Sequence, residues 1–205
     1  MVTIRQDILP GILPSTIDVD HVSKGLADSA IVKLTVGASA NRIIALGIAY
    51  HPSSSGQVEF VSLANTDQVY IISFPNRRRL DANSQLALLL SASTGKASGD
   101  ARRDPLQHTR LVGFGMAQTA VQVSHATQTS VSGVDLSLLC APNTWEPCSP
   151  AEVAQLTLQR EVNRWGIGKL WTGGDVNPER SVALQAWLAA WCVYPLEQIP
   201  CLISP

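Results

Sequence analysis

The sequence predicts an α/β domain in which helices flank a mixed β-sheet, and three observations support this fold class. Strand-like segments joined by short turns occupy residues 30–74. Strand-like and helix-like segments then alternate between residues 80 and 135, and two helix-like segments follow. An antiparallel meander followed by alternating strands and helices is typical of a mixed sheet with parallel later strands.

The first part of the chain is mixed in character. Residues 1–28 contain two prolines and two glycines, which interrupt regular elements. We therefore expect residues 1–28 to form an N-terminal arm with one short helix near 20–26. The predicted domain then extends over residues 29–205, with no internal repeat and no second boundary.

The meander is predicted from apolar patterns. Residues 30–36 alternate as in a strand, and residues 42–50 form a nearly continuous apolar run, as expected for a strand buried on both faces. Residues 57–64 and 68–74 are two further strand-like segments, and the Asn-Thr-Asp triplet between them predicts a tight turn.

Helices and short strands alternate next. Leucines and alanines at helical spacing predict a helix over residues 80–90, and the polar residues 91–105 predict a loop. A short strand over 110–115 continues into a helix over 116–124, and another strand follows at 130–135.

Two helices close the predicted fold. Ser149, followed by proline and then by Glu152, matches a capping box with proline at the first helical position. We expect this helix to run to about Trp165, where two glycines stop it. The last helix is predicted over residues 178–194.

Composition excludes several functional classes. The 205 residues are 45% hydrophobic and 15% charged, with a net charge of −1, which argues against disorder and against electrostatic nucleic-acid binding by the whole chain. We recognise no membrane span and no signal peptide, so we expect a nuclear or cytoplasmic protein that is not secreted and has no membrane partner. The four cysteines form no C-x-x-C pair, so we expect reduced thiols, no metal site and no cofactor.

Four short strings resemble the motifs of one family, and they occur in the family's order. They are QVEFVSLANTDQVYIISF, LVGFGMAQTAVQV, GVDLS and LAAWCV. The chain is similar to DEDD-type 3′–5′ exonucleases, nearest to their Werner-type branch, over roughly residues 30–199. This resemblance implies a ribonuclease H-like fold.

The resemblance also shows which residues replace the family's metal-binding acids. Those four acids fall on Gly47, Ala49, Thr119 and Cys192. The family's two-metal hydrolysis needs several carboxylates, and Mg²⁺ prefers charged oxygen ligands. The acid nearest to the first motif is Glu59, on the next strand, and no one-residue shift restores a carboxylate. We therefore interpret the chain as a degenerate, catalytically inactive exonuclease-like domain.

Concentrated positive charge occurs at two places. These are the run Arg77-Arg78-Arg79 and the pair Arg102 and Arg103. One interpretation is contact with nucleic-acid phosphates beside the former substrate cleft. The alternative, which we favour, is a solvated loop and helix start.

Two tryptophans suggest a partner surface. Trp187 and Trp191 are four residues apart and therefore share a face of the last helix. That face could belong to the core, or it could bind a protein partner or a second copy of the chain.

Three functions remain open on the sequence. The first is an inactive scaffold for a protein partner or for self-association. The second is binding of single-stranded RNA or DNA without cleavage. The third is an active nuclease with non-standard ligands, for which His51 and Asp135 are the candidates. Asp135 is more simply explained as a strand-end acid that caps the following turn.

Overall fold

A computed structural model of the chain describes residues 2–3, 8–11, 16–22, 27–37, 43–50, 58–73, 80–81, 84–92, 109–139, 146–172 and 177–195. In this part of the chain, seven strands form one sheet in the order β1-β2-β5-β4-β3-β6-β7. They are β1 (Val2–Thr3), β2 (Thr16–Val22), β3 (Ile43–Tyr50), β4 (Val58–Ala64), β5 (Gln68–Ser73), β6 (Arg110–Gly113) and β7 (Val134–Asp135).

The pairing confirms the predicted fold class. β3, β4 and β5 form an antiparallel meander. β6 then joins β3 in parallel, and β7 joins β6 in parallel. Asn65 closes the tight turn between β4 and β5, because its Oδ1 accepts hydrogen bonds from the amides of Asp67 (2.9 Å) and Gln68 (2.8 Å).

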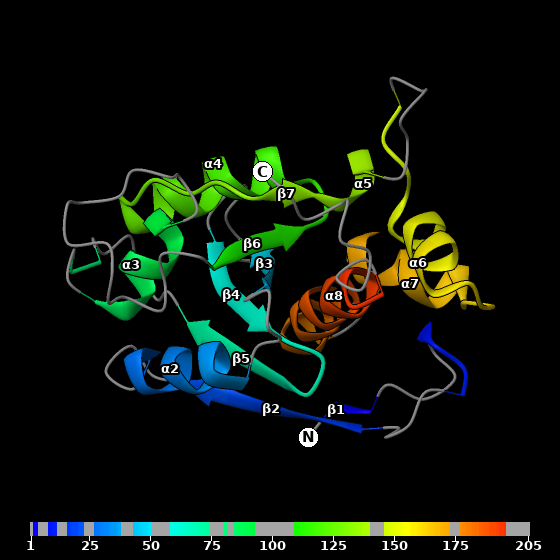
Figure 1. Cartoon of the computed structure of the whole chain (residues 1–205), viewed down its shortest axis with the longest axis horizontal. Helices are drawn as coiled ribbons and strands as arrows, with labels where there is room; N and C mark the ends of the chain where they lie inside the picture. Colours follow the sequence, from blue (N-terminus) through cyan, green and yellow to red (C-terminus); the bar gives the residue numbers. More distant parts are fainter. Residues whose placement is uncertain are drawn as a thin grey trace.

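Helices cover both faces of the sheet, as Figure 1 shows. On one face α8 packs across β3, β4 and β5, and α6 and α7 pack against α8. On the other face α2, α3 and α4 contribute to a second core. The helices of the described residues are α2 (Ala27–Gly37), α3 (Gln85–Ala92), α4 (Met116–Thr127), α5 (Leu136–Leu139), α6 (Pro150–Leu158), α7 (Arg164–Thr172) and α8 (Pro178–Val193). None of these helices combines the length and apolarity that crossing a membrane requires.

β3 lies between the two cores. Ala45 belongs to the core under α8, whereas Ile44 and Leu46 belong to the opposite core, and all three are buried. This alternation confirms the expectation of a strand that is buried on both faces, and it explains why residues on the two sides of β3 are apolar.

The prediction of a short helix near residues 20–26 is wrong. Residues 16–22 form β2, which pairs in parallel with β5 and antiparallel with β1. The physical reason is a period of two in this segment, in which Ile17 and Val19 contribute to the core while Asp18 and Asp20 are exposed. A strand of the sheet therefore lies inside the segment 1–28 that we interpreted as an arm.

The prediction of a strand over residues 30–36 is also wrong, because this segment belongs to helix α2. Ala30, Ile31 and Leu34 are buried, while Val32 and Lys33 are exposed. This pattern has the spacing of one helical face. The β-branched residues in this segment are typical of strands, and for this reason the helical spacing of its buried residues was not recognised in the sequence.

Two helix boundaries also differ from the sequence prediction. α3 begins at Gln85 and not near residue 80. The helix expected to reach Trp165 ends at Leu158, because Gln159 adopts a left-handed conformation with φ of 50°. A separate helix, α7, then begins at Arg164 and contains the two glycines that were expected to stop the first helix. Asn163 caps α7 by accepting a hydrogen bond from the Gly166 amide at 3.0 Å.

The capping box at the start of α6 is confirmed. The Ser149 hydroxyl accepts a hydrogen bond from the Glu152 amide, and the Glu152 carboxylate accepts from the Ser149 amide at 2.8 Å. The Ser149 hydroxyl also donates to this carboxylate at 2.8 Å. These hydrogen bonds, first from the Ser149 hydroxyl and then from its amide, lower the pKa of Glu152.

We predict that Ser149→Ala raises the pKa of Glu152 towards its ordinary value, because the main hydrogen bond to the charged form is lost. NMR titration of the Glu152 carboxyl measures the change. Since the folded-state pKa is depressed, the capping box stabilises the fold above the unfolded-state pKa. This contribution is lost as the pH falls through the folded-state pKa. An unchanged pKa in Ser149→Ala would contradict this account.

Candidate functional site

The first-motif strand of the resemblance is β3, which carries Gly47 and Ala49. Gly47 pairs with Ser62 of β4, and Ala49 pairs with Phe60. Gly47 is buried and lies on the side of the sheet that α8 covers. This is the position where the resemblance implies the first catalytic carboxylate.

No side chain fits at position 47 without displacing its neighbours. A Cβ atom there would lie 2.7 Å from Ser62 Oγ, 3.0 Å from the Val182 carbonyl oxygen and 3.2 Å from the Ala186 amide nitrogen. Two of these three neighbours are backbone atoms of α8, which cannot rotate away as the end of a side chain can. The buried Ser62 hydroxyl donates a hydrogen bond to the same Val182 carbonyl at 2.8 Å. The α8 backbone therefore lies directly against the place where a carboxylate would begin.

The other two motif positions lie in the interior. Thr119 of α4 is buried, and its amide donates to the Gly115 carbonyl within the helix start. Cys192 of α8 is fully buried. It lies more than one helical turn beyond Ala186, at about 3.6 residues per turn. The α8 residues that contact Gly47 are thus Val182 and Ala186, which the sequence comparison did not select.

A signal for this contact was present in the sequence. Small residues recur along α8 at helical spacing, namely Ala183, Ala186 and Ala190, and all three are buried. Small residues on one side of a helix allow a close approach to a neighbouring backbone, and glycine on the facing strand allows the same.

Carboxylates do not gather near this position. Glu59, next to Phe60 on β4, is half-buried, and its Oε2 has no hydrogen-bond partner among the described residues. Within the described part of the chain, no group of three or more His, Cys, Asp or Glu side chains is placed to hold a metal ion. A single carboxylate cannot supply the ligand set that two divalent cations need.

Asp135 has a structural role. Its Oδ1 accepts hydrogen bonds from the amides of Gly115 (3.1 Å) and Ser137 (3.0 Å), and its Oδ2 accepts from the Met116 amide (2.8 Å). The carboxylate thus joins the end of β7 to the start of α4, where Gly115 has a φ of 61° that favours glycine. Capping of the turn after the strand, which the sequence predicted, is confirmed, and the carboxylate also holds α4.

Several residues selected from the sequence lie outside the described residues. They are Arg77, Arg78, Arg79, Arg102, Arg103 and His51. Their contact with nucleic acid, or their role in cleavage, stays a prediction.

The two tryptophans of the last helix differ in exposure. Trp187 is 1% exposed, and its indole N–H donates to the Thr66 carbonyl at 3.1 Å, so this side chain belongs to the core. Trp191 is half-buried, with its ring 5.8 Å from that of Trp187 and 6.0 Å from that of Tyr194. Tyr194 is exposed. An aromatic row therefore leads from the core to the surface at the end of α8.

A more exposed tryptophan lies on α7. Trp165 is 71% exposed, and the Lys169 ammonium lies 3.5 Å from its ring centroid. This cation–π contact covers part of the ring and leaves much of the indole in solvent. Sequence patterns alone do not separate Trp165 from the buried tryptophans, because its exposure depends on α7 being a separate helix.

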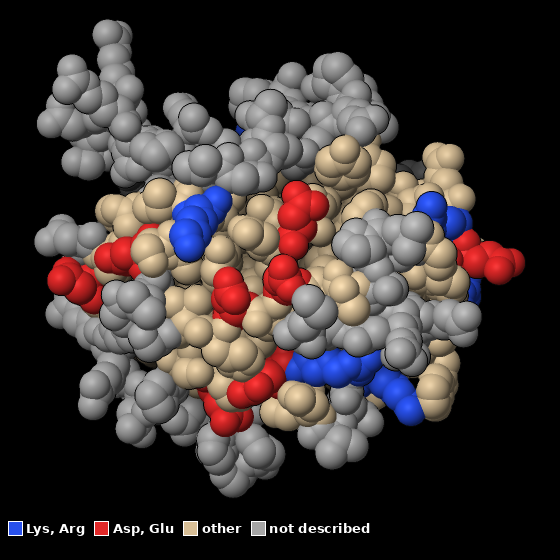
Figure 2. Space-filling view, turned by 90° about the horizontal axis from the view of Figure 1, so that it is seen from below, with Lys and Arg blue, Asp and Glu red and all other residues tan. Residues whose placement is uncertain are grey.

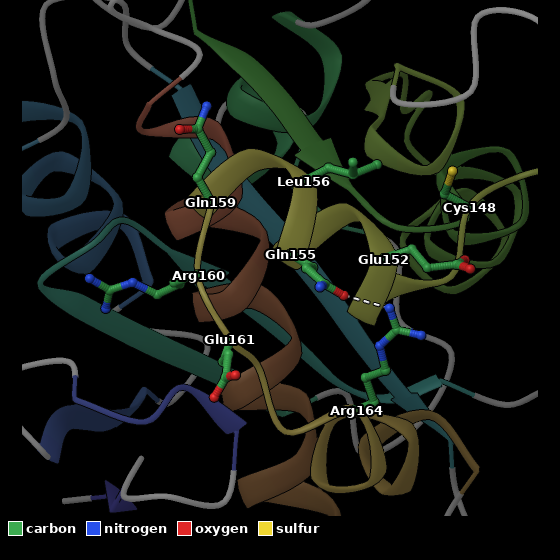
Figure 3. A pocket seen from close by; sticks show the side chains of 8 residues that line it. All are labelled: Cys148, Glu152, Gln155, Leu156, Gln159, Arg160, Glu161 and Arg164. Carbon is green, nitrogen blue, oxygen red and sulfur yellow. Dashed lines mark hydrogen bonds between the residues drawn. The ribbon is translucent and has the colours of Figure 1, made fainter.

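α6 and the start of α7 line an open groove of about 810 Å³, shown in Figure 3. Gln155 lies in its middle, where its side-chain carbonyl accepts a hydrogen bond from the Arg164 guanidinium. Leu156 also lines the groove and is 58% exposed. The groove combines an exposed apolar side chain with charges of both signs.

The face that carries β2 is acidic. Figure 2 views the molecule from the side on which β1 and β2 lie in Figure 1, and acidic side chains gather in the middle of this face. β2 contributes the exposed residues Asp18 and Asp20. Burial, and to a lesser degree the neighbouring Asp20, raises the pKa of Tyr70 on β5.

Solved structures of nucleases have the same arrangement of elements. The EXO domain of Nibbler from Aedes aegypti matches 92% of this chain and 98% of its own length, with 17% identity and a TM-score of 0.52. NrnC of Brucella melitensis with bound Mg²⁺ matches 89% of this chain and 81% of its own, with 11% identity and a TM-score of 0.53. The chain has an exonuclease-like fold. No family model and no curated protein matches the sequence.

The exonuclease-like fold is thus shown by structural likeness, over nearly the whole chain. The mixed sheet is of the ribonuclease H-like type that the resemblance implied. In this exonuclease-like fold, β3 and α8 are in direct contact at Gly47.

We predict that Gly47→Ala lowers the free energy of unfolding by about 1–3 kcal/mol, because the added methyl group overpacks the contact with α8. The matched control is Gly168→Ala in α7, where a Cβ meets no atom within 4 Å. This control should raise stability by about 0.5–1 kcal/mol, since alanine favours the helix. Urea unfolding of both variants measures the difference. Equal effects of the two substitutions would refute the close contact at Gly47.

We also predict that Asp135→Ala lowers the free energy of unfolding by about 1–2 kcal/mol, because three amides lose their acceptor. Asp135→Asn keeps one side-chain oxygen and should lose less. Hydrogen exchange of the Met116 amide should become faster in both variants. Wild-type exchange in Asp135→Ala would show that the carboxylate does not hold α4.

Proposed function

We propose that this chain is a catalytically inactive exonuclease-like domain that acts as a scaffold for a protein partner or for a second copy of itself. The observation that carries the proposal is the contact at Gly47. A Cβ atom at this position would lie 3.0 Å from a carbonyl oxygen of the α8 backbone. In two-metal hydrolysis, the attacking and leaving oxygens are stabilised by cations that several carboxylates hold. The backbone of α8 lies in tight contact with the Cβ position from which the first of these carboxylates would start.

The remaining motif positions support the same conclusion. Thr119 and Cys192 are buried in the interior, where neither a hydroxyl nor a thiol is a good ligand for a hard cation such as Mg²⁺. Asp135, one of the two candidates for a non-standard ligand, has both carboxylate oxygens engaged by backbone amides. An active nuclease built on these residues is therefore disfavoured.

Charge favours a protein partner over nucleic acid. The net charge of the chain is −1, and the face around β2 carries exposed carboxylates (Figure 2). Nucleic-acid binders concentrate Lys and Arg on one face to replace the counterions of the phosphates. Binding of single-stranded RNA or DNA through the arginines at 77–79, 102 and 103 is the alternative.

The test is a gel assay of the purified chain with labelled single-stranded DNA and RNA in Mg²⁺ and in Mn²⁺. We expect the substrate to stay intact and unretarded. Gly47→Asp, which restores the first acid, should gain no cleavage and should unfold at lower urea concentration. Stepwise shortening from the 3′ end that EDTA abolishes would overturn the proposal, and intact but retarded substrate at low salt would favour the nucleic-acid alternative.

A further inference from the structure

The groove between α6 and α7 carries two cations and two anions. Arg160 and Glu161 come from the connection between the helices, Glu152 comes from α6, and Arg164 begins α7. No ion pair joins these four side chains to one another at 4.0 Å or less. The groove is therefore neutral in sum, and although Glu152 also accepts hydrogen bonds from Ser149 and Arg164 donates one to Gln155, none of the four charges is neutralised by another at ion-pair distance.

The four charges are arranged in pairs on the two sides of the groove. In Figure 3, Arg160 and Glu161 lie on one side of Gln155, and Glu152 and Arg164 lie on the other. Each side thus has one cation and one anion. A two-fold rotation that exchanges the sides brings Arg160 opposite Glu152 and Glu161 opposite Arg164. This order of charges is complementary to itself.

Self-complementarity is the property that a two-fold symmetric interface requires. In such an interface the same patch is used on both subunits, so a residue that contacts another across the axis is contacted in turn by its copy. A groove for a foreign peptide has no need of this symmetry. The exposed Leu156 lies above Gln155 in Figure 3 and adds apolar surface next to the charged side chains.

We propose that the α6–α7 groove is the surface through which two copies of this chain associate. This inference rests on the proposed scaffold function and names the partner as a second copy. In the pair, Arg164 of each subunit faces Glu161 of the other, and Arg160 faces Glu152. Complementary charges fix the orientation of the two subunits, and Leu156 supplies the apolar contact that association also needs.

Charge reversal at Arg164 and Glu161 tests the surface, and because Arg164→Glu also removes the hydrogen bond to Gln155, the fold of each variant is checked separately. Arg164 is exposed at the first position of α7, where an acid is favoured by the helix dipole. Glu161 is exposed in the connection before it. Glu152 is left unchanged because it belongs to the capping box. Arg110→Glu, an exposed position on β6, is the matched control for the change in net charge.

The experiment is sedimentation velocity of the full chain over a wide range of protein concentration, with circular dichroism to confirm the fold of each variant. We expect the wild type and Arg110→Glu to form dimers. Arg164→Glu and Glu161→Arg should each weaken dimerisation by about tenfold or more, because like charges then face each other. The double variant Arg164→Glu with Glu161→Arg should recover dimerisation, because it restores opposite charges across the axis.

Two results would overturn the inference. One is a wild-type chain that stays monomeric at every concentration, and the other is a dimer whose strength neither single reversal changes. Both results are independent of the gel assay with nucleic acid. If the chain is monomeric and leaves the nucleic acid intact, the proposed dimer interface is rejected, but the proposal of an inactive exonuclease-like domain is retained. Cleavage of the substrate by a dimer would reject the scaffold function and retain the surface.

Discussion

The packing of α8 directly on the backbone of β3 is the contact on which the rest of the structure depends. Gly47 has no side chain to hold the helix away, and the Ser62 hydroxyl fixes the helix by its hydrogen bond to the Val182 carbonyl. With α8 at this depth, the Trp187 indole reaches the turn between β4 and β5, where it donates to Thr66. α6 and α7 then pack against α8, so the position of the groove between them also follows from the approach of α8 to the sheet.

The two faces of the sheet are packed with different sets of side chains. Under α8 the strands present Ala45 and Ala64 together with larger residues such as Phe60 and Ile71, and the helix contributes several alanines. On the opposite face the same strands present larger residues such as Leu46 and Leu63, which meet the side chains of α2, α3 and α4. Small side chains allow backbones to approach closely, whereas large ones fill a thicker layer at the same packing density. Gly47, where the resemblance implies the first acid, lies on the α8 side of the sheet, and the close approach of the α8 backbone leaves little space for a side chain at that position.

Most of the order of strands and helices after residue 42 could be predicted from the sequence, because apolar runs, tight-turn residues and the capping box at Ser149 are local signals. The short helix α5 and the separate helix α7 were not predicted. β2 was missed because Asp18 and Asp20 resemble a helix start, whereas their alternation with Ile17 and Val19 has meaning only beside β5. α2 was missed because its β-branched residues favour strands in isolation. The site could be predicted only in part. The resemblance places residues without carboxylates at the four motif positions, but the α8 residues that face Gly47 depend on the depth at which a distant helix packs.

The contact at Gly47 also limits how this chain could change. Under the proposed function, a return to catalysis would need four carboxylates, and the Cβ atom of the first of them would lie only 3.0 Å from a backbone oxygen of α8. Such a substitution lowers the stability of the fold immediately, whereas metal binding would contribute only once the other carboxylates are also present. The helix would have to move before the ligands could be useful. Single substitutions at the motif positions are therefore expected to destabilise the fold without restoring a metal site. Residues on the outer surface are not limited by this contact and can change independently of it.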